Sequence, residues 1–570
     1  MCGISGRIGI NVLPQLLEDL KKLEYRGYDS AGLGYFKKSN ITLKKVKGSV
    51  HKLEGKTKFE TNIGIAHTRW ATHGRPTKDN AHPHISYGGN WAVVHNGIIE
   101  NVNQLKLQLG GVQFKSQTDT EVIAHLLEKH GSGLQSLQQV SNLLHGSFAV
   151  VALNTKYPDT LFVMKNKSPM YVYNETGEVV VTSDTLTLKK QEYYELYDGE
   201  IGVLTKNNVR FYNQNGEVLK QKINFTSMDF VLPSTNYKHH MLKEIFDTPL
   251  ALKYLIDYYS KTSINIDIKK YSKIKLFGCG TAYHTALMGA GYLQKLTRKE
   301  CNANVASDYL DTAPIVDKKS LNIFISQSGE TADTMECMNL VKRNKGKCVL
   351  ITNKPNSTMA KLADVVLPMC AGTEVAVAST KAYTCGVAVL YLMASYFKYG
   401  TLSKALAKLK HLQKNIAYYL QRFEPIDVRK IKKLKTCFFI GRGMDYITAL
   451  EGSLKLKEIS YINCIAFPAG ELKHGTLALI DNNSMVFAIS TSKTLHPRLV
   501  SAISEIEARG GKVQLLSTVK DTGQIFNSVD EMLDGLQIMV YLQLLSYYTA
   551  VAKGYNPDKP RNLAKSVTVG

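Results

Sequence analysis

Cys2 is a residue that could do chemistry because of its place in the chain. Removal of the initiator Met1, which is normal before a small residue, would make it the first residue. Its α-amine would then have a pKa of about 7.7–8.0, well below that of a lysine. Such an amine takes up the proton of the thiol, directly or through water, and so activates the sulfur. By itself a cysteine at position 2 can also be incidental.

Long motifs accompany this cysteine. They are EYRGYDSAG at Glu24–Gly32, HTRWATHG at His67–Gly74, HNGIIEN at His95–Asn101 and QTDTEVIAHL at Gln117–Leu126. Together with the initial CGI, this set resembles the class II glutamine amidotransferases, which are N-terminal-nucleophile glutaminases. The resemblance covers essentially the whole first domain. It implies that the thiol attacks the side-chain amide of glutamine, giving a γ-glutamyl thioester and ammonia.

The same resemblance assigns roles by position. A guanidinium suits the α-carboxylate of glutamine because it binds bidentately, a carboxylate suits the α-ammonium, and N–H donors suit the tetrahedral oxyanion. The matching residues are Arg69 with Thr72 and His73 for the carboxylate, Asp119 for the ammonium, Asn96 and the Gly97 N–H for the oxyanion, and Trp70 as the gate of an ammonia passage.

Several of these residues have simpler explanations. Asn96–Gly97 on its own indicates a type I′ hairpin turn. Asp119 could be only a helix cap, and Trp70 could be an ordinary core residue. A metal site is not expected from the spacing of the remaining candidates, which lack a cysteine or acidic partner: His67, His82, His84 and His95.

Two loops in the second part of the chain suit a phosphate. SQSGET at Ser326–Thr331 follows the buried strand Leu321–Ile325 and opens a helix from about Ala332. Hydroxyls and free N–H groups at a helix N-terminus bind phosphate well. Gly280–Thr281 forms a second such loop. Each loop alone is weak evidence because Ser and Thr caps are common. The GxxxxGK[ST] signature is missing, so binding of a nucleoside triphosphate is not supported.

A wider set of motifs extends this reading: CGTAY, SQSGETADT, EVAVASTKAYT, EGSLKLKEISYI, AGELKHG and PRNLAKSVTV. The set resembles sugar-isomerase domains, which bind phosphosugars. Over nearly the full length the chain resembles the family of isomerising glutamine–fructose-6-phosphate aminotransferases. That implies formation of L-glutamate and D-glucosamine 6-phosphate from L-glutamine and D-fructose 6-phosphate. It also implies a homodimer, no pyridoxal phosphate, and no metal or other cofactor.

Roles in the sugar site follow from this resemblance. Glu458 would move the proton between C1 and C2 of the sugar, and Lys565 would form a Schiff base with the ketone. His474 would assist ring opening and, in this family, comes from the partner subunit. The other implied residues are Thr281, Ser326, Gln327, Ser328 and Thr331 for the phosphate, Val377 and Ser379 for the sugar, and Glu451 and Lys455 as further catalytic residues.

Here too simpler explanations are open. Glu451 and Lys455 stand four residues apart, and an ordinary helix ion pair of that spacing contributes only about 0.2–0.5 kcal/mol. Glu458 could lie on a solvated helix face, and Lys457 is expected to. One departure is visible, because this chain has Ala282 where the family often has Ser after CGT. The phosphate loop therefore has one hydroxyl fewer.

The elements that carry the amidotransferase motifs belong to residues 1–230. Short alternating apolar runs separated by turn residues predict antiparallel strands with one buried face. Helical patterns cover Val12–Leu23 and Thr120–Glu128. We therefore expect an α+β domain built on sheets, and the resemblance specifies the αββα sandwich of the N-terminal-nucleophile glutaminases.

From about residue 245 helices alternate with short apolar strands, which is typical of parallel sheets. KIKLFGCGTA, NIFISQSGET and NKGKCVLIT recur later as LKTCFFIGRG, MVFAISTSKT and RGGKVQLLS, and the first two matches lie 163 residues apart. This repeat predicts two α/β domains with doubly wound parallel sheets. We expect them at 245–405 and 425–555, after a polar junction at Asn224–His240. A C-terminal catalytic tail at 556–570 follows.

Composition fits these expectations. The 570 residues predict three or four domains, and 44% hydrophobic with 21% charged residues excludes a mainly disordered chain. The apolar run Cys385–Phe397 is shorter than the roughly 20 residues of a membrane span. The start MCGISGRIG lacks the pattern of a signal peptide. Nine scattered cysteines without CxxC indicate neither a disulfide framework nor a zinc ribbon, so we expect a cytoplasmic protein.

The formal charge of +23 comes from lysines spread along the chain, which favours a solvated surface over nucleic-acid binding. Two other amidotransferase types are disfavoured, because the SGGxDS loop of asparagine synthetases and the acidic diphosphate motif of phosphoribosyl transfer are missing. The alternative from another class is a catalytically silent phosphosugar-binding sensor with a glutaminase-like domain.

Overall fold

The computed structural model describes residues 2–55, 59–175, 177–188, 192–224, 237–312, 314–520, 523 and 525–567. The chain forms two compact units. Unit 1 comprises Met1–Ser227 with Ser566–Val569, and unit 2 comprises Met228–Lys565 with Gly570. The predicted junction Asn224–His240 lies mostly outside the described residues.

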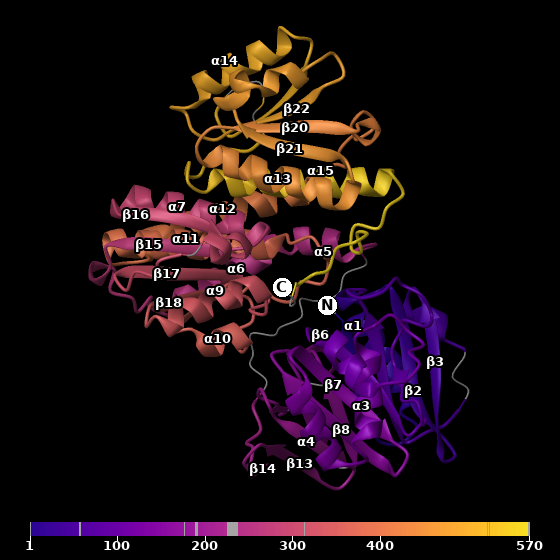
Figure 1. Ribbon diagram of the computed structural model, residues 1–570. Helices are drawn as coiled ribbons and strands as arrows, with labels where there is room; N and C mark the ends of the chain where they lie inside the picture. The colour runs from indigo at the N-terminus through magenta and orange to yellow at the C-terminus, as the bar shows by residue number, and fades with distance from the viewer. Residues whose placement is uncertain are drawn as a thin grey trace. The chain divides into compact units, whose positions relative to one another are not determined.

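Unit 1 contains two seven-stranded antiparallel sheets, drawn in indigo to magenta in Figure 1. The first sheet has the order β11-β9-β10-β1-β4-β2-β3, and the second has the order β14-β13-β12-β8-β7-β6-β5. The strands of the first sheet are β1 (Gly3–Ile8), β2 (Ser30–Lys37), β3 (Asn40–Lys47), β4 (Ile63–Arg69), β9 (Tyr171–Glu175), β10 (Glu178–Thr182) and β11 (Tyr194–Glu195). Those of the second are β5 (His84–Ile85), β6 (Trp91–Ile99), β7 (Gly146–Asn154), β8 (Tyr157–Asn166), β12 (Ile201–Thr205), β13 (Val209–Asn213) and β14 (Gly216–Val218).

The two sheets of unit 1 pack face to face. Ile4 and Ile65 of the first sheet share one apolar cluster with Val94 and Val151 of the second. Helix α1 (Leu13–Leu23) covers the outer face of the first sheet with leucines at helical spacing. The helices on the outer face of the second sheet are α2 (Val102–Leu109), α3 (Thr120–Lys129) and α4 (Leu134–Leu143). The layer order is therefore αββα, as predicted.

The alternating runs became strands because each has one face to bury between the sheets. Both predicted helices of unit 1 are present within one residue, as α1 and α3. The alternating apolar runs correspond to β4 and β6–β10, whereas the remaining strands of unit 1 and the helices α2 and α4 were not predicted individually.

Unit 2 begins with α5 (His240–Phe246) and α6 (Thr248–Tyr259) and continues into a first module, residues 273–399. Its five strands are parallel, in the order β16-β15-β17-β18-β19. They are β15 (Lys273–Gly278), β16 (Glu300–Val305), β17 (Ser320–Ser326), β18 (Lys347–Thr352) and β19 (Val365–Pro368). Its helices are α7 (Thr281–Thr297), α8 (Ala306–Tyr309), α9 (Ala332–Arg343), α10 (Thr358–Leu362) and α11 (Lys381–Tyr399), and α12 (Ser403–Gln421) follows.

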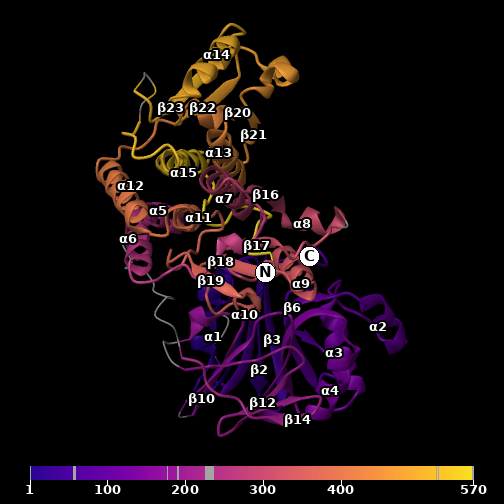
Figure 2. The ribbon, with the colours of Figure 1, turned by 90° about the vertical axis from the view of Figure 1, so that its left-hand side faces the viewer.

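The second module, residues 436–552, repeats this plan with four parallel strands in the order β21-β20-β22-β23. The strands are β20 (Thr436–Gly441), β21 (Asn463–Pro468), β22 (Met485–Ser490) and β23 (Lys512–Ser517), and the helices are α13 (Met444–Ser460), α14 (His496–Glu507) and α15 (Asp534–Ala552). Helices α13 and α15 lie side by side (Figure 2). One apolar cluster runs through both modules.

The strand register corrects one detail of the predicted repeat. Phe277 of β15 pairs with Phe324 of β17, and the equivalent Ile440 of β20 pairs with Ala488 of β22. Ser326 therefore corresponds to Ser490, one residue further than the sequence match indicated. A shift by one residue exchanges the two faces of a strand, so only the register identifies equivalent side chains.

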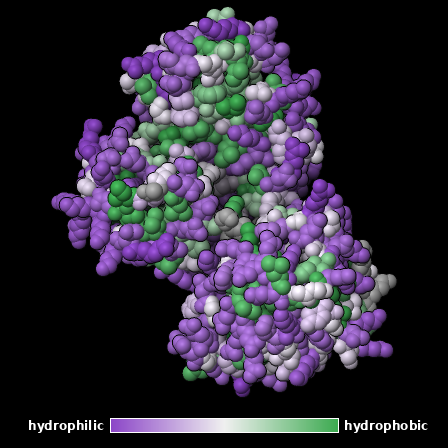
Figure 3. All heavy atoms as spheres, viewed as in Figure 1, coloured by the Kyte–Doolittle hydropathy of each residue, from purple (hydrophilic) through white to green (hydrophobic). Residues whose placement is uncertain are grey.

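The apolar run Cys385–Phe397 lies within α11, most of which is buried in the core of unit 2. Within the described residues no helix is long and apolar enough to span a membrane. On the face drawn in Figure 3, hydrophilic residues cover most of the surface of each unit.

Candidate active sites

The Cys2 thiol in unit 1 stands directly before β1. The Trp70 N–H donates to its Sγ at 3.3 Å, and the thiol is 3.5 Å from the Trp70 carbonyl oxygen. Burial raises the pKa of this thiol above its ordinary value, while the chain's amino terminus, the Trp70 N–H and Arg69 act to lower it. A thiol that is hard to ionise needs a nearby base, which the amine of an N-terminal cysteine would provide.

The Cys2 carbonyl is held from two sides. Asn96 Nδ2 donates to it at 2.9 Å and Arg26 Nε at 3.2 Å. Arg26 also forms an ion pair with Asp184 at 2.6 Å, in a buried network that Tyr25 joins. Sequence reasoning gave Arg26 no role, although it lies inside a quoted motif. Its place inside the motif EYRGYDSAG was the available signal, because its burial and its contact with Cys2 are seen only in the structure.

Asn96 and Gly97 lie inside strand β6 and not in a hairpin turn, so that simpler explanation is wrong. Gly97 has φ +130, and a Cβ there would lie 1.9 Å from the Ser147 carbonyl oxygen. Only glycine fits this backbone. His67 Nε2 lies 3.2 Å from Asn96 Oδ1, which leaves the amide nitrogen of Asn96 to face Cys2.

Arg69 ends β4 and is almost fully buried. Its guanidinium donates to the carbonyls of His73, Gly74 and Arg75. Burial lowers its pKa, and the nearby charges of Cys2 and Asp119 act in the opposite direction. Arg69 is thus an electrostatic neighbour of both. His73 is half-buried and Thr72 is exposed.

Asp119 occupies the N-cap position of α3, but its side chain does not cap that helix. Its Oδ2 instead accepts the Ile99 N–H at 2.9 Å. Trp70 is only half-buried and meets Tyr28 edge to face at 5.9 Å, unlike the fully buried core residue Trp91. The plain cap and core explanations therefore do not describe Asp119 and Trp70.

Four histidines of this domain, His67, His82, His84 and His95, form a buried cluster. The rings of His67 and His82 stack at 4.0 Å, and His84 meets His82 edge on. Burial lowers the pKa of His67 to about 3 and lowers those of His82, His84 and His95 as well. These rings are neutral at pH 7. Within the described residues no group of three or more His, Cys, Asp or Glu side chains is arranged to hold a metal.

The predicted phosphate loops of unit 2 follow β15 and β17, which are adjacent strands whose connections run in opposite directions. Ligands of such sheets bind at this switch point. Ser326 Oγ lies 2.9 Å from Thr331 Oγ1 and accepts the Gly329 N–H at 3.0 Å. Thr331 is the N-cap of α9 without a side-chain cap bond, and Gln327 and Ser328 lie between them.

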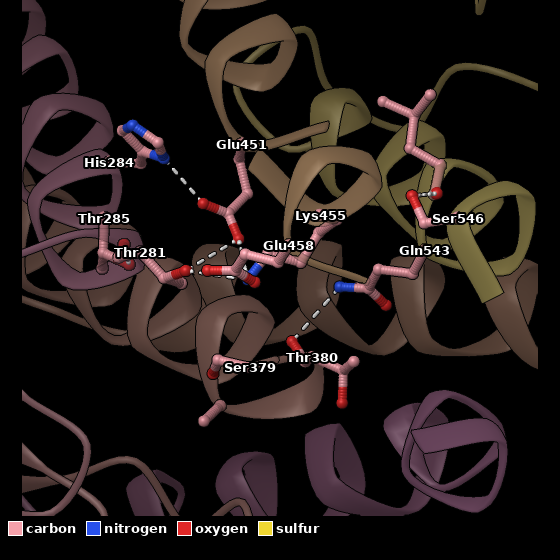
Figure 4. Close-up of polar contacts among 12 residues, drawn as sticks. Thr281, His284, Thr285, Ser379, Thr380, Glu451, Lys455, Glu458, Gln543 and Ser546 are labelled. Atoms are coloured by element: carbon pink, nitrogen blue, oxygen red, sulfur yellow. Dashed lines mark hydrogen bonds and ion pairs between the residues drawn. The ribbon is translucent and has the colours of Figure 1, made fainter. Parts of the chain in front are cut away.

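Thr281, at the start of α7, faces α13 of the second module (Figure 4). Its hydroxyl donates to Glu451 Oε1 at 3.0 Å and accepts from Lys455 Nζ at 3.1 Å. Lys455 Nζ also reaches Glu458 Oε2 at 2.9 Å, and His284 Nδ1 lies 2.6 Å from Glu451 Oε2. Sequence reasoning missed His284, which stands one turn after Thr281.

Glu451 and Lys455 are both fully buried, so they do not form a surface ion pair. Burial acts to raise the pKa of Glu451, but Lys455 and His284 hold it below its ordinary value. Burial acts to lower the pKa of Lys455, and the two glutamates raise it. Glu458 is partly exposed at the edge of this network, while Lys457 is exposed as expected. The network fixes Glu458 in place next to a permanent cation.

Lys565 of the tail is buried, and its Nζ lies 2.5 Å from Glu374 Oε2. Glu374 belongs to the loop before α11, which also carries Val377 and Ser379. The Val377 N–H donates to the Asp558 carbonyl of the tail at 3.3 Å, and Ser379 Oγ donates to Glu374 at 3.0 Å. His474 ends the short helix Glu471–His474 and is exposed.

Comparison with known proteins agrees with this geometry. The glutamine amidotransferase domain family matches residues 67–190, and the SIS domain family matches 267–396 and 430–534. Fold and site thus define an amidotransferase domain followed by two sugar-isomerase domains, as the sequence predicted. "Glutamine--fructose-6-phosphate aminotransferase [isomerizing]" of Caldanaerobacter subterraneus is 42% identical and that of Fusobacterium nucleatum 38%, each over all of both chains. The chain belongs to this aminotransferase family.

One solved structure extends the agreement to unit 2. The C-terminal domain of glucosamine-fructose-6-phosphate aminotransferase from Francisella tularensis is 32% identical, with a TM-score of 0.53. The match covers 57% of this chain and 100% of that one.

Proposed function

We propose that this chain converts L-glutamine and D-fructose 6-phosphate into L-glutamate and D-glucosamine 6-phosphate. The observation that carries the proposal is the end-to-end match to relatives of that name, together with the candidate residues of both sites in one chain. The match does not favour a catalytically silent sensor. We further propose the four-part division at 1–230, 245–405, 425–555 and 556–570.

In the first reaction the Cys2 sulfur attacks the glutamine amide, and the N-terminal amine accepts the thiol proton. Asn96 Nδ2 and the Gly97 N–H stabilise the oxyanion. Arg69, with Thr72 and His73, binds the α-carboxylate, and Asp119 binds the α-ammonium. Ammonia leaves and water later hydrolyses the thioester. Ammonia released into water would become ammonium, which is not nucleophilic, so a dry passage gated by Trp70 must carry it to the sugar.

In the second reaction the loops Thr281 and Ser326–Thr331 bind the phosphate, and Val377 and Ser379 line the sugar. Lys565 forms a Schiff base with the ketone, which weakens the neighbouring C–H bond, and Glu458 moves the proton between C1 and C2. The Glu451–Lys455 pair holds Glu458 in position. His474 of the partner subunit opens the sugar ring, which requires a homodimer.

All nine cysteines are free, which suits a cytoplasmic location.

Two variants separate the reactions. We expect Cys2→Ala to abolish glutamine hydrolysis and still isomerise fructose 6-phosphate slowly to glucose 6-phosphate. We expect Lys565→Ala to keep glutamine hydrolysis and lose formation of glucosamine 6-phosphate, with products identified by mass spectrometry. A Lys565→Ala enzyme that makes the amino sugar at nearly the parent rate would contradict the Schiff-base role. A parent enzyme that releases no ammonia from glutamine would instead support the silent sensor.

A further inference from the structure

Glu374 has no role in the reaction as described so far, yet its carboxylate contacts the reactive lysine. The side chain is fully buried and accepts Lys565 Nζ at 2.5 Å and Ser379 Oγ at 3.0 Å through Oε2. Its Oε1 accepts the Thr380 N–H at 2.8 Å, the Thr380 hydroxyl at 3.2 Å and the Ala382 N–H at 3.3 Å. The carboxylate is thus fixed at the N-terminus of the 19-residue helix α11, where the helix dipole stabilises an anion.

Three other ionisable groups lie around the Glu374–Lys565 ion pair: Lys381, Asp247 and Glu244. Lys381 of α11 is buried, and its Nζ lies 3.6 Å from Asp247, at the end of α5. Glu244 of α5 accepts the Val375 and Ala376 N–H groups through Oε1. Its Oε2 is buried and has no hydrogen-bond partner among the described residues.

The two buried carboxyl groups differ in charge. Burial and the neighbouring Glu374 raise the pKa of Glu244 to about 8, so Glu244 is mostly neutral at pH 7. Burial also acts to raise the pKa of Glu374, but Lys565, Thr380 and Lys381 hold it well below its ordinary value. One negative charge, on Glu374, therefore faces Lys565.

We propose that Glu374 is the counter-ion of the protonated Schiff base on Lys565, an inference that rests on the proposed function. When the ammonium condenses with the ketone, two N–H protons leave with the ketone oxygen as water. A C=N bond forms, and the nitrogen keeps one hydrogen and the positive charge. The charge stays on the same atom, so the carboxylate that pairs with the ammonium also pairs with the iminium.

This pairing matters because only the protonated imine withdraws electrons strongly from the neighbouring carbon. An opposite charge within about 4–6 Å favours the charged form and shifts a pKa by about one to three units. Glu374 would therefore keep the imine protonated at a pH where an unpaired imine would be neutral. Glu374 would act on the reacting nitrogen and not on the proton that Glu458 moves.

The test uses the full chain carrying Cys2→Ala and fructose 6-phosphate without glutamine. Borohydride traps the imine, and mass spectrometry measures the sugar on Lys565 from pH 6 to pH 10. In the Glu374→Gln variant the pH at which half of the trapping is lost should fall by about one to three pH units. Isomerisation at pH 8 should fall at least about tenfold. Glu374→Asp, which keeps the charge, should restore part of both.

Glu244→Gln is the control, because it replaces the other buried carboxyl group, whose pKa of about 8 leaves it mostly neutral at pH 7. Trapping by this variant should match the parent up to about pH 7, and its midpoint should shift by clearly less than that of Glu374→Gln. Circular dichroism and denaturant unfolding of the Glu374 variants, compared with the parent, report whether unit 2 folds. If Glu374→Gln does not fold, Glu374→Asp decides, because moving the carboxylate back should lower the midpoint measurably.

The outcomes separate the two claims. No sugar trapped on Lys565 in the parent protein would contradict the Schiff base itself, and with it the proposed mechanism. Trapping in the parent, with an unchanged midpoint in folded Glu374→Gln or in Glu374→Asp, would contradict only the counter-ion. Equal midpoint shifts in Glu244→Gln and Glu374→Gln would also overturn it, since the effect would then not depend on the charge beside Lys565.

Discussion

The two modules of unit 2 have the same turn between their first strand and the following helix, but different side chains lie in it. In each, a strand ends at a glycine, Gly278 or Gly441, whose added Cβ would lie within 2.6 Å of the next helix's backbone. The residue it would meet is Ala282 in the first module and Asp445 in the second. Asp445 is buried and accepts the Thr491 N–H at 2.9 Å and the Thr491 hydroxyl at 2.6 Å.

The second module thus places its own carboxylate on the backbone N–H groups that follow β22. The first module has only a methyl group at the equivalent position, and the Ser326–Thr331 loop bonds within itself: Ser326 Oγ accepts the Gly329 N–H, and Ser328 Oγ accepts the Glu330 N–H. Ser490, the counterpart of Ser326, lies 2.8 Å from His496 Nδ1 instead. In the second module a carboxylate of the protein itself thus occupies the turn after the strand, and in the first module we propose that the phosphate of the sugar occupies the equivalent place.

The largest effect is expected when the aspartate of the second module is introduced at the equivalent position of the first. Ala282→Asp would bring a carboxylate to the phosphate loop, and juxtaposed like charges cost several kcal/mol. We expect the KM for fructose 6-phosphate to rise at least about 100-fold, since about 1.4 kcal/mol is a factor of ten, with glutamine hydrolysis retained. Ala282→Asn is the neutral control of similar size. Equal KM values for the two variants would refute the charge argument.

The second effect is on stability. Burial raises the pKa of Asp445 to about 6, although hydrogen bonds from Thr491 and Ser492 act to lower it. Because the folded-state pKa lies above the unfolded one, this group's stabilisation is complete below about pH 4 and is lost as pH rises through about 6. The unfolding free energy of the parent relative to Asp445→Asn should therefore fall by about 2 kcal/mol from pH 4 to pH 7. A pH-independent difference in denaturant titrations would contradict this.

The third effect separates equivalent serines. Ser326→Ala removes a hydroxyl that accepts the Gly329 N–H, which should weaken fructose 6-phosphate binding by about 1–1.5 kcal/mol, or roughly tenfold in KM. Ser490→Ala, its counterpart by strand register, should leave KM unchanged within twofold. Steady-state kinetics on both variants measure this. Similar losses in the two would mean that both loops bind the sugar phosphate.

The smallest expected effect is a gain in affinity for fructose 6-phosphate. Ala282→Ser restores the hydroxyl that the family often has after CGT, and one hydrogen bond to a charged group is worth about 1.5–3 kcal/mol at most. We expect a two- to fivefold lower KM because the existing donors already serve the phosphate. Isothermal titration with fructose 6-phosphate would check this, and weaker binding would show that the loop has no room for the hydroxyl.

Most of the architecture and the proposed reacting residues could already be predicted from the sequence. Alternating runs gave the strands of unit 1 because the period of a strand is visible over a few residues. Cys2, Lys565 and Glu458 could be proposed as reacting residues because they lie in contiguous motifs that resemble those of the aminotransferase family. The internal repeat predicted two modules of one fold, because similarity between two segments of a sequence can be detected without a structure.

Tertiary structure decided what no short window of sequence contains. The sequence left a hairpin turn open as an explanation of Gly97, which the pairing of β6 with β7 excludes. It also left an ordinary helix ion pair open for Glu451 and Lys455, which are fully buried and contact Thr281 of α7. Glu374 and Lys565 are 191 residues apart, and Ser326 and Ser490 became equivalent only through strand register. Burial, ion pairing and strand register depend on contacts between segments that are distant in the sequence. The contacts that set the protonation state and the position of each side chain are therefore known only from the folded structure.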